Sequence, residues 1–172
     1  FEEIEAITII DVLRRAQVDA TTASVIDNPA MGSHNIKVYT DSSLDEINPN
    51  DFDMLVLPGG MPGSKHLKED PRIQEIIKQF MSDNKYLAAI CAAPIALGKA
   101  GALQGKNATC FPGFESELTD ATVSADPVVA DGKVITGKGA GCAIPFALAL
   151  VEIIKGKEIS DKIKNALQVY WM

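Results

Sequence analysis

One cysteine stands at the point where an apolar run ends and a helix is expected to begin. It is Cys91 in the stretch AAICAAP, residues 88–94. A thiol at the start of a helix lies near unpaired backbone N–H groups and the positive end of the helix dipole, which favour the thiolate. Cys91 is therefore a candidate nucleophile, held on a sharp turn like the serine of the strained elbow in other hydrolase folds. The alternative is a buried structural cysteine, a common fate of this residue type.

One of three acidic residues near the start of the chain could work with such a thiol. Glu5 is flanked by Ile4 and Ala6 in EEIEAI. An acid between apolar residues is expected to face a pocket, where desolvation raises its pKa and lets it exchange a proton with a thiol. The competing interpretation for Glu5, as for Glu2 and Glu3, is that acids simply suit the first turn of a helix.

Two glycines end a neighbouring strand in the stretch DMLVLPGG, residues 53–60. Backbone N–H groups of Gly59 and Gly60, with that of Ala92, could stabilise a negatively charged oxygen. The glycines could equally serve a tight turn that needs positive φ. The two interpretations are compatible.

Other motifs carry weaker signals. The stretch GKGAG, residues 137–141, resembles a dinucleotide-binding loop, but no acid ends a strand about 20 positions further on, so no nucleotide cofactor is predicted. His34 and His66 lie in turn-like and polar stretches and are expected at the surface. Cys110 and Cys142 are expected to fill the core, and Cys142 follows the glycine loop that could line the pocket.

Composition narrows the class of protein. The chain has 172 residues, net charge −7 and a pI of about 4.8, so nucleic acid is not an expected partner. It has no apolar run near the ~20 residues that a membrane helix needs. Three cysteines without a C-x-x-C pair predict neither a disulfide framework nor a metal site, and favour the cytoplasm. We expect one domain spanning residues 1–172.

Strands and helices alternate along the chain, and several strands are apolar on both faces, which is typical of a mostly parallel sheet covered by helices. Asp70 and Pro71 suit the start of a helix, and Gly101 suits a helix end. The expected elements are a helix over 2–16, strands over 18–26, 36–40 and within 53–60, a helix from 70, a strand over 86–90, a helix over 92–101, a hairpin over 128–136, and helices over 142–156 and 160–168.

The first helix shows an amphipathic period. Its spacing is traced by Ile4, Ile7, Thr8, Asp11 and Val12. A doubly wound sheet normally has a strand before its first helix, and the chain begins with Phe rather than Met. We therefore expect a strand of roughly ten residues upstream.

Several segments together resemble the ThiJ/PfpI superfamily, in particular its DJ-one subfamily of small cofactor-free proteins described as glyoxalase III and protein deglycases. The resemblance runs from Phe1 to about Ala166. It implies a flavodoxin-like sandwich, a homodimer and no cofactor. The segments that carry it are FEEIEAI, LVLPGG, AAICAAP, TCFPG, GKVITGKGAG and FALALVEIIKGKE.

The resemblance also implies roles for particular residues. The reactive cysteine of the family falls on Cys91, its buried glutamate on Glu5, and its backbone donors on Gly60 and Ala92. The chain departs from the family at Ala92, where peptidase-like relatives carry His.

Two further departures affect the expected pocket. Phe111 stands where many close relatives carry His, and His34 stands where relatives often carry an Arg that reaches the partner subunit. With Gly59 and Gly139, these two residues are the remaining candidates for the pocket lining.

The resemblance leaves three functions open. In the first, the Cys91 thiolate adds to methylglyoxal or glyoxal and Glu5 moves protons to give a 2-hydroxy acid, or the same chemistry acts on glycated thiols or amines. In the second, Cys91 is an oxidation sensor or the switch of a redox-regulated chaperone under oxidative stress. A cysteine peptidase or amidase is the third, and the absence of a nearby histidine in the sequence disfavours it.

Overall fold

Four strands form the central sheet of the computed structural model, which describes residues 1–170. Their order is β5–β6–β10–β9; the first three are parallel, and β9 pairs with β10 as an antiparallel hairpin. The predicted sheet and hairpin are thus confirmed. The bounds are β5 Met54–Leu57, β6 Tyr86–Ile90, β9 Val128–Asp131 and β10 Val134–Gly137.

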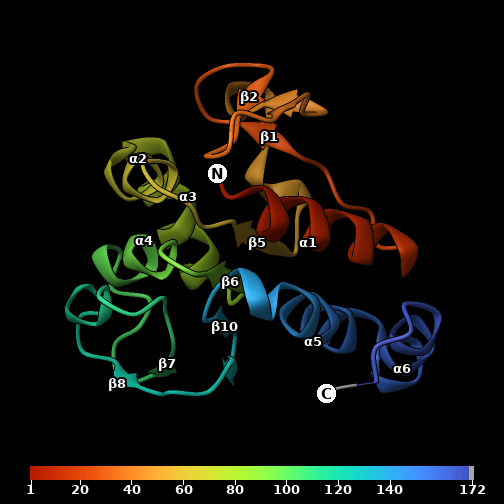
Figure 1. The fold of residues 1–172 in the computed structure, drawn as a ribbon. Coiled ribbons are helices and arrows are strands. Elements are labelled where there is room, and N and C mark those ends of the chain that lie inside the picture. Colours follow the sequence, from red (N-terminus) through yellow and green to blue (C-terminus); the bar gives the residue numbers. More distant parts are fainter. Residues whose placement is uncertain (171–172) are drawn as a thin grey trace.

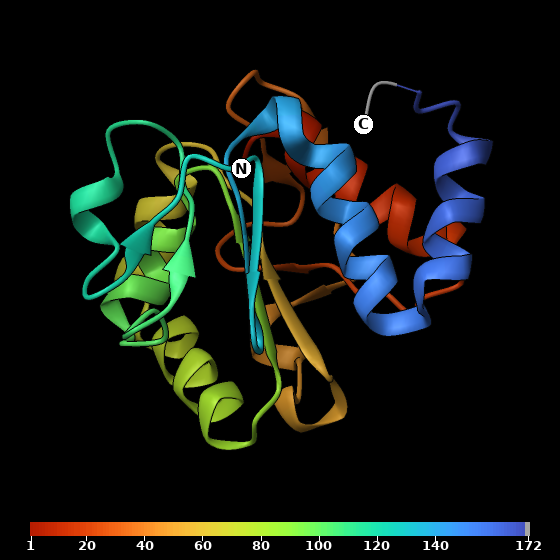
Figure 2. The ribbon, with the colours of Figure 1, turned by 90° about the horizontal axis from the view of Figure 1, so that it is seen from below.

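Helices cover both faces of this sheet, which Figure 2 shows edge-on between two layers. One layer holds α2 (Gly63–Glu69), α3 (Pro71–Ser82) and α4 (Pro94–Lys99), and the other holds α1 (Glu3–Arg15), α5 (Ala143–Lys155) and α6 (Lys157–Ala166). The arrangement is the flavodoxin-like α/β sandwich expected from the sequence. Within residues 1–170, no helix is both long and apolar enough to cross a membrane.

Strand β6 shows why the sheet needs both layers. Leu87 and Ala89 join the core formed with α3 and α4, whereas Ala88 and Ile90 join the core formed with α1 and α5. All four side chains are at most 2% exposed. Successive residues of a strand point to opposite faces, so an uninterrupted apolar strand must be covered twice.

The strands expected over 18–26 and 36–40 are much shorter in the structure. Within these stretches only two-residue strands form, β1 (Ala23–Ser24) and β3 (Lys37–Val38). Strand β1 pairs with β4 (Ser42–Ser43), and β3 pairs with β2 (Ala30–Met31). The β-branched residues around them have strand propensity, but propensity alone does not extend a strand beyond its paired partner. Another two-residue pair joins β7 (Asn107–Ala108) and β8 (Thr122–Val123).

Helix boundaries also differ from expectation. Helix α2 was not anticipated, because its polar sequence GSKHLKE buries only Ser64 and shows no apolar period. The helix after Cys91 begins at Pro94 rather than at residue 92, and the last helix begins at Lys157 rather than at residue 160. Short 3₁₀ turns cover Leu44–Glu46, Pro49–Asp51, Glu115–Glu117 and Ala140–Cys142.

The buried face of α1 is not the one that the isoleucine spacing indicated. Ile4 and Ile7 are 58% and 43% exposed, while Ile9 and Leu13 are 4% and 5% exposed and pack toward α5. Glu5 lies on this inner face, one helical turn before Ile9. Two buried acids, Glu3 and Glu5, begin this face, so its period is not apparent from the apolar residues alone.

Candidate active site at Cys91 and Glu5

Cys91 sits on the sharp turn that joins β6 to α4. Its φ is +65°, in the left-handed region that costs an L residue roughly 1–2 kcal/mol. The turn is held on both sides, because the Cys91 N–H donates to the Gly137 carbonyl at 2.8 Å and the Phe111 N–H donates to the Cys91 carbonyl at 2.8 Å. The thiol therefore stands at the carboxyl ends of β6 and β10, as expected, in a partly exposed residue.

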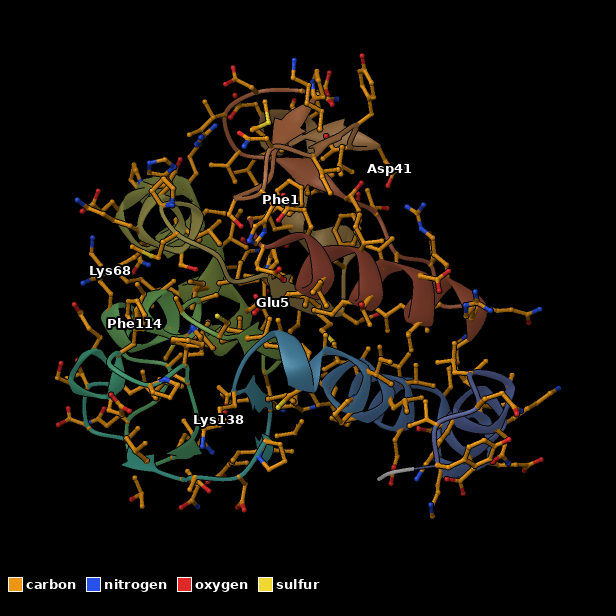
Figure 3. All side chains as sticks on the ribbon, in the orientation of Figure 1. Phe1, Glu5, Asp41, Lys68, Phe114 and Lys138 are labelled. Carbon is orange, nitrogen blue, oxygen red and sulfur yellow. The ribbon has the colours of Figure 1, made fainter. Side chains whose placement is uncertain are left out.

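Glu5 belongs to the first turn of α1, the helix labelled in Figure 1, and its side chain is labelled in Figure 3. The residue is 0% exposed. Its Oε2 accepts a hydrogen bond from the Gly59 N–H at 2.9 Å, whereas its buried Oε1 has no hydrogen-bond partner in the described part of the chain. One carboxylate oxygen is thus fixed, and the other is left without a donor.

Gly59 brings the acid and the thiol together. A Cβ at this position would lie 2.3 Å from Glu5 Oε2 and 2.5 Å from Cys91 Cβ. Real Cβ atoms do not approach other atoms so closely, so only glycine fits between the two side chains. The predicted pair of Cys91 and Glu5 is in contact range because this residue has no side chain.

Each group shifts the pKa of the other, in opposite directions, because the hydrogen bond between them lowers the pKa of Glu5 and raises that of Cys91. Burial raises the pKa of Glu5, and the charge of Glu2 adds to that effect. Burial, followed by the charge of Glu5, raises the pKa of Cys91 to about 12, against the N–H groups of Gly60 and Ala92. The position of Cys91 at a helix start predicts a resting thiolate. The structure favours a protonated thiol instead, because burial and the neighbouring carboxylate outweigh the backbone donors.

The backbone donors predicted around the thiol divide into two sets. The N–H groups of Gly60 and Ala92 are directed at the Cys91 sulfur. The Gly59 N–H is already used by Glu5. Gly60 has φ +92°, and a Cβ there would lie 2.4 Å from the backbone nitrogen of Glu2. Residue 60 therefore has to be glycine, because its φ is positive and because a side chain there would collide with the backbone of Glu2.

Phe111 and Gly139 lie together at the rim of this site. Phe111 is tied to Cys91 by its backbone hydrogen bond, and its side chain is 47% exposed. Its ring carbons Cδ2 and Cε2 lie 3.2 and 3.8 Å from the point that a Cβ of Gly139 would occupy. Both predicted lining residues thus meet next to the turn that carries the nucleophile.

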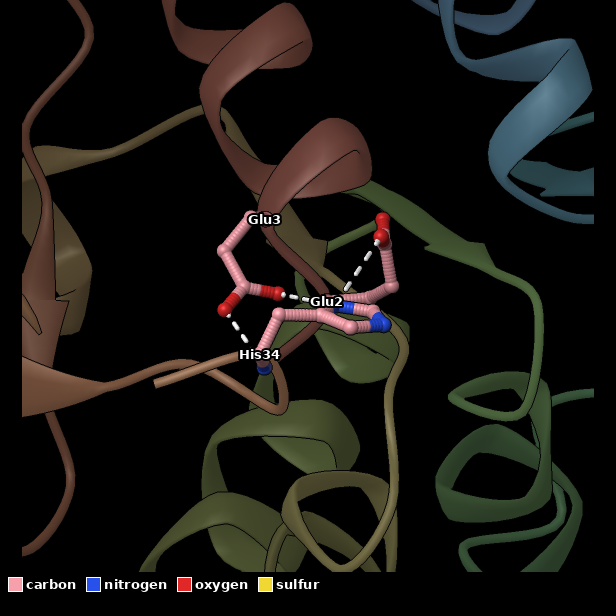
Figure 4. A group of neighbouring side chains, drawn as sticks. All are labelled: Glu2, Glu3 and His34. Atoms are coloured by element: carbon pink, nitrogen blue, oxygen red, sulfur yellow. Dashed lines mark hydrogen bonds and ion pairs between the residues drawn. The ribbon is translucent and has the colours of Figure 1, made fainter. Parts of the chain in front are cut away.

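His34 lies on Glu3 rather than on Cys91 (Figure 4). Glu3 receives the backbone N–H of His34 at 2.7 Å and lies 2.8 Å from its Nδ1, and it also bonds Ser33 Oγ at 3.2 Å and the Ile36 N–H at 3.5 Å. The sequence predicts for Glu3 only that it complements the helix dipole. The structure shows it holding a loop that is distant in sequence.

Glu2, Glu3 and His34 also form the one group among the described residues whose donor atoms could ligate a metal ion. These atoms lie within 4.8 Å of one another. The Glu3 oxygens already accept several hydrogen bonds, and the Glu2 carboxylate accepts the Glu5 N–H at 2.8 Å as the cap of α1. The existing bonds account for the position of both carboxylates.

The structure also places the remaining cysteines and the second histidine. Cys110 is 3% exposed in the core beside α4, as expected. Cys142 is partly exposed and belongs to neither core, so the core position expected for it is wrong. His66 is exposed on α2, which confirms the surface position expected for it.

Comparison with known proteins identifies the class to which this fold and site belong. The sequence model of the DJ-1/PfpI family matches residues 1–153, and the chain belongs to that family. The crystal structure of Drosophila melanogaster DJ-1beta superposes with a TM-score of 0.92 at 35% identity, covering 99% of this chain and 93% of that one.

Two curated relatives refine the similarity. Protein DJ-1 homolog A of Arabidopsis thaliana is 41% identical over 170 residues, which are 96% of this chain and 43% of that protein. The chain therefore spans less than half the length of the plant relative. The glutathione-independent glyoxalase DJR-1.2 of Caenorhabditis elegans is 32% identical over 168 residues, covering 96% of this chain and 89% of that protein.

Proposed function

We propose that the protein is a glyoxalase III-type enzyme, which converts methylglyoxal or glyoxal to a 2-hydroxy acid without a cofactor. The observation that carries the proposal is the state of the Glu5 carboxyl, which is fully buried and faces the Cys91 thiol. Its Oε1 has no hydrogen-bond partner among the described residues. An acid in that state is ready to take up and return a proton. The name of the C. elegans relative, a glutathione-independent glyoxalase, supports the same reaction.

The first step uses Glu5 as a base. As the Cys91 sulfur attacks the aldehyde carbon, its proton passes to Glu5, a carbon–sulfur bond forms, and the carbonyl oxygen takes the negative charge. The N–H groups of Gly60 and Ala92, already directed at the sulfur, are placed to stabilise that adjacent oxygen. Return of the proton to this oxygen gives a neutral hemithioacetal.

The next steps move a proton between carbons and release the acid. Glu5 takes the proton from the former aldehyde carbon and returns it to the neighbouring carbon, while the hydroxyl proton moves from the first oxygen to the second, which turns the hemithioacetal into a thioester of the 2-hydroxy acid. Water then cleaves the carbon–sulfur bond and restores the thiol. The net reaction adds one water to the dicarbonyl, so it consumes no oxidant or reductant.

The raised pKa of Glu5 suits this role. A base works best when its pKa lies near the working pH, and an exposed glutamate is too weak a base to take a thiol proton efficiently. Burial moves the pKa of Glu5 upward, in the required direction. The strained turn at Cys91 keeps the sulfur aimed at the same space.

The test is lactate formation from methylglyoxal without glutathione, with D- and L-lactate measured separately. We expect many turnovers per subunit for the wild type and none above background for Cys91→Ser. Cys142→Ser, which changes a partly exposed cysteine outside the pair, is the matched control and should keep its activity. Absence of turnover from a folded wild-type protein would refute the proposal.

The same pair could act on glycated thiols or amines, because release of the dicarbonyl from them feeds the same hemithioacetal at Cys91. A preformed hemithioacetal of methylglyoxal and a small thiol separates the two reactions. If the chain acts on the adduct itself, lactate forms faster than the adduct releases free methylglyoxal. If it acts only on the free dicarbonyl, that release limits the rate.

Redox sensing is a second candidate function. The N–H groups of Gly60 and Ala92 beside the sulfur favour it, because they could hold the oxygens of an oxidised Cys91, and protonated Glu5 could donate to them. A sensor, or a redox-regulated chaperone switched at Cys91, reacts once with peroxide and stops, whereas the enzyme consumes many equivalents of dicarbonyl.

Neither histidine pairs with Cys91, since His34 contacts Glu3 and His66 is exposed on α2, so a Cys–His peptidase receives no support.

We also propose a homodimer working in the cytoplasm. Ile4 and Ile7 on α1, with Met31 and Ile36 near the β2–β3 hairpin, are 43–58% exposed and provide apolar surface for a second copy. Three free cysteines suit a reducing compartment. Light scattering on the wild type and on Ile4→Glu tests the dimer; an unchanged mass in the variant would contradict this surface.

A further inference from the structure

Phe111 is an exposed aromatic residue whose position depends directly on the nucleophile. Its backbone N–H donates to the carbonyl of Cys91 at 2.8 Å, so the two residues are joined across neighbouring segments. Its side chain is 47% exposed, although large apolar side chains elsewhere near the sheet are buried. An isolated exposed aromatic needs no explanation, but one bonded to the peptide of a candidate nucleophile does.

Gly139 fixes where the Phe111 ring lies. Ring carbon Cδ2 is only 3.2 Å from the point that a Cβ of Gly139 would occupy, so the ring rests on the bare backbone after β10. The same end of β10 supplies the Gly137 carbonyl that accepts the Cys91 N–H. The ring, the glycine and the nucleophile's turn therefore form one continuous rim.

We propose that Phe111 forms an apolar wall of the Cys91 site and selects uncharged 2-oxoaldehydes with an apolar or aromatic substituent over glyoxal. The inference rests on the proposed function. A substituent that covers the exposed ring removes apolar surface of both partners from water, and an aromatic one also stacks. An anionic substituent would place a second negative charge beside Glu5, so it is disfavoured. Contacts of this size in an apolar pocket discriminate by about tenfold or more.

The first experiment compares kcat/KM for phenylglyoxal and glyoxal, measured as mandelate and glycolate. We expect the ratio of the two values to fall by about tenfold in Phe111→Ala and to be partly restored in Phe111→Leu, which keeps an apolar side chain. Tyr170→Ala removes another exposed aromatic, beyond α6, and should leave the ratio unchanged. A ratio in Phe111→Ala equal to the wild type would overturn the inference.

A second experiment needs no turnover. Phenacyl bromide and iodoacetamide each alkylate a thiol: the carbon–sulfur bond forms, the carbon–halogen bond breaks, and halide and a proton leave. The rate at Cys91, followed by peptide mass, should favour the phenacyl reagent about tenfold more in the wild type than in Phe111→Ala.

The two experiments separate the inference from the function on which it rests. If no dicarbonyl is turned over but the alkylation preference depends on Phe111, the proposed reaction fails and the apolar wall stands. If turnover is normal and neither preference depends on Phe111, the reaction stands and the wall is refuted. If alkylation shows no dependence on Phe111 and turnover is absent, both fail.

Discussion

Glu3 and Glu5 belong to the same helical turn, and both are buried, yet the structure moves their pKa values in opposite directions. Burial opposes ionisation of Glu3, but its hydrogen bonds from the His34 loop outweigh that effect and lower its pKa to about 2. Glu5 has only the Cys91 thiol and the Gly59 N–H as donors, so burial prevails and raises its pKa. The number of donors that face a buried carboxyl, rather than burial itself, decides whether it anchors structure or stores a proton.

The largest expected effect is a loss of turnover when Glu5 is replaced, which the matching replacement of Glu3 should not cause. Glu5→Gln should lower methylglyoxal turnover by about 100-fold or more, because general acid–base catalysis contributes at least that factor. Glu3→Gln should stay within a few-fold of the wild type, since Glu3 binds the loop and not the thiol. Lactate assays on the two variants, with folding checked by circular dichroism, measure the difference. Equal losses in both would abolish the distinction between them.

Sequence reasoning could find Glu5 but could not find what Glu3 does. Glu5 was singled out by the apolar residues that flank it, and Cys91 by the end of an apolar strand at a helix start. The bonds of Glu3 reach residues 33–36, about thirty positions away, and no local pattern reveals a contact that only tertiary structure creates.

The protonation of Cys91 was equally hidden. The sequence shows the helix start, which favours a thiolate, but not the burial or the distance to Glu5 that raise the pKa of the thiol. The fold was more accessible. Buried apolar strands such as β6 keep their limits because packing on both faces defines them, whereas two-residue strands such as β1 depend on partners that the sequence does not indicate.

Gly59 and Gly32 each pack against one of the two acids, so their alanine variants compare the two acids by steric crowding. A Cβ at Gly59 would lie 2.3 Å from Glu5 Oε2, and a Cβ at Gly32 would lie 2.3 Å from Glu3 Oε1. Both alanine variants should lose about 1–3 kcal/mol of unfolding free energy through overpacking. Only Gly59→Ala should also lose turnover, because it drives Glu5 and Cys91 apart. Urea unfolding together with lactate assays checks both, and an active Gly59→Ala would contradict the site.

Smaller effects are expected in stability, with opposite signs for the two acids. Burial destabilises the charged form of Glu5, so Glu5→Gln should raise Tm near neutral pH. Glu3 has a lowered pKa, so its contribution is present above its usual value of 4.5 and is lost as pH falls toward about 2. Glu3→Gln should therefore lower Tm by a few degrees near neutral pH and by less in acid.

His34 sets the upper end of the pH range in which its pairing with Glu3 stabilises the fold. Glu3 raises the pKa of His34, so the stability from this pair is complete below the usual histidine value of 6.5 and declines as pH rises through the raised pKa. The difference in Tm between the wild type and Glu3→Gln should thus be greatest between pH 4.5 and 6.5. Scanning calorimetry across pH measures it, and a difference that grows steadily above this window would contradict the anchor.

The coupling between the Glu5 carboxylate and the Cys91 thiol is tested most directly by the rate of Cys91 alkylation with iodoacetamide against pH, in the wild type and in Glu5→Gln. The wild-type rate should climb about tenfold per pH unit through the neutral and mildly alkaline range, because the pKa of its thiol is raised to about 12. Loss of the carboxylate charge should lower that pKa, so the variant reacts faster at each pH although it has lost turnover. A variant thiol that reacts at the same rate as the wild type, or more slowly, would show that the Glu5 carboxylate does not raise the pKa of the thiol.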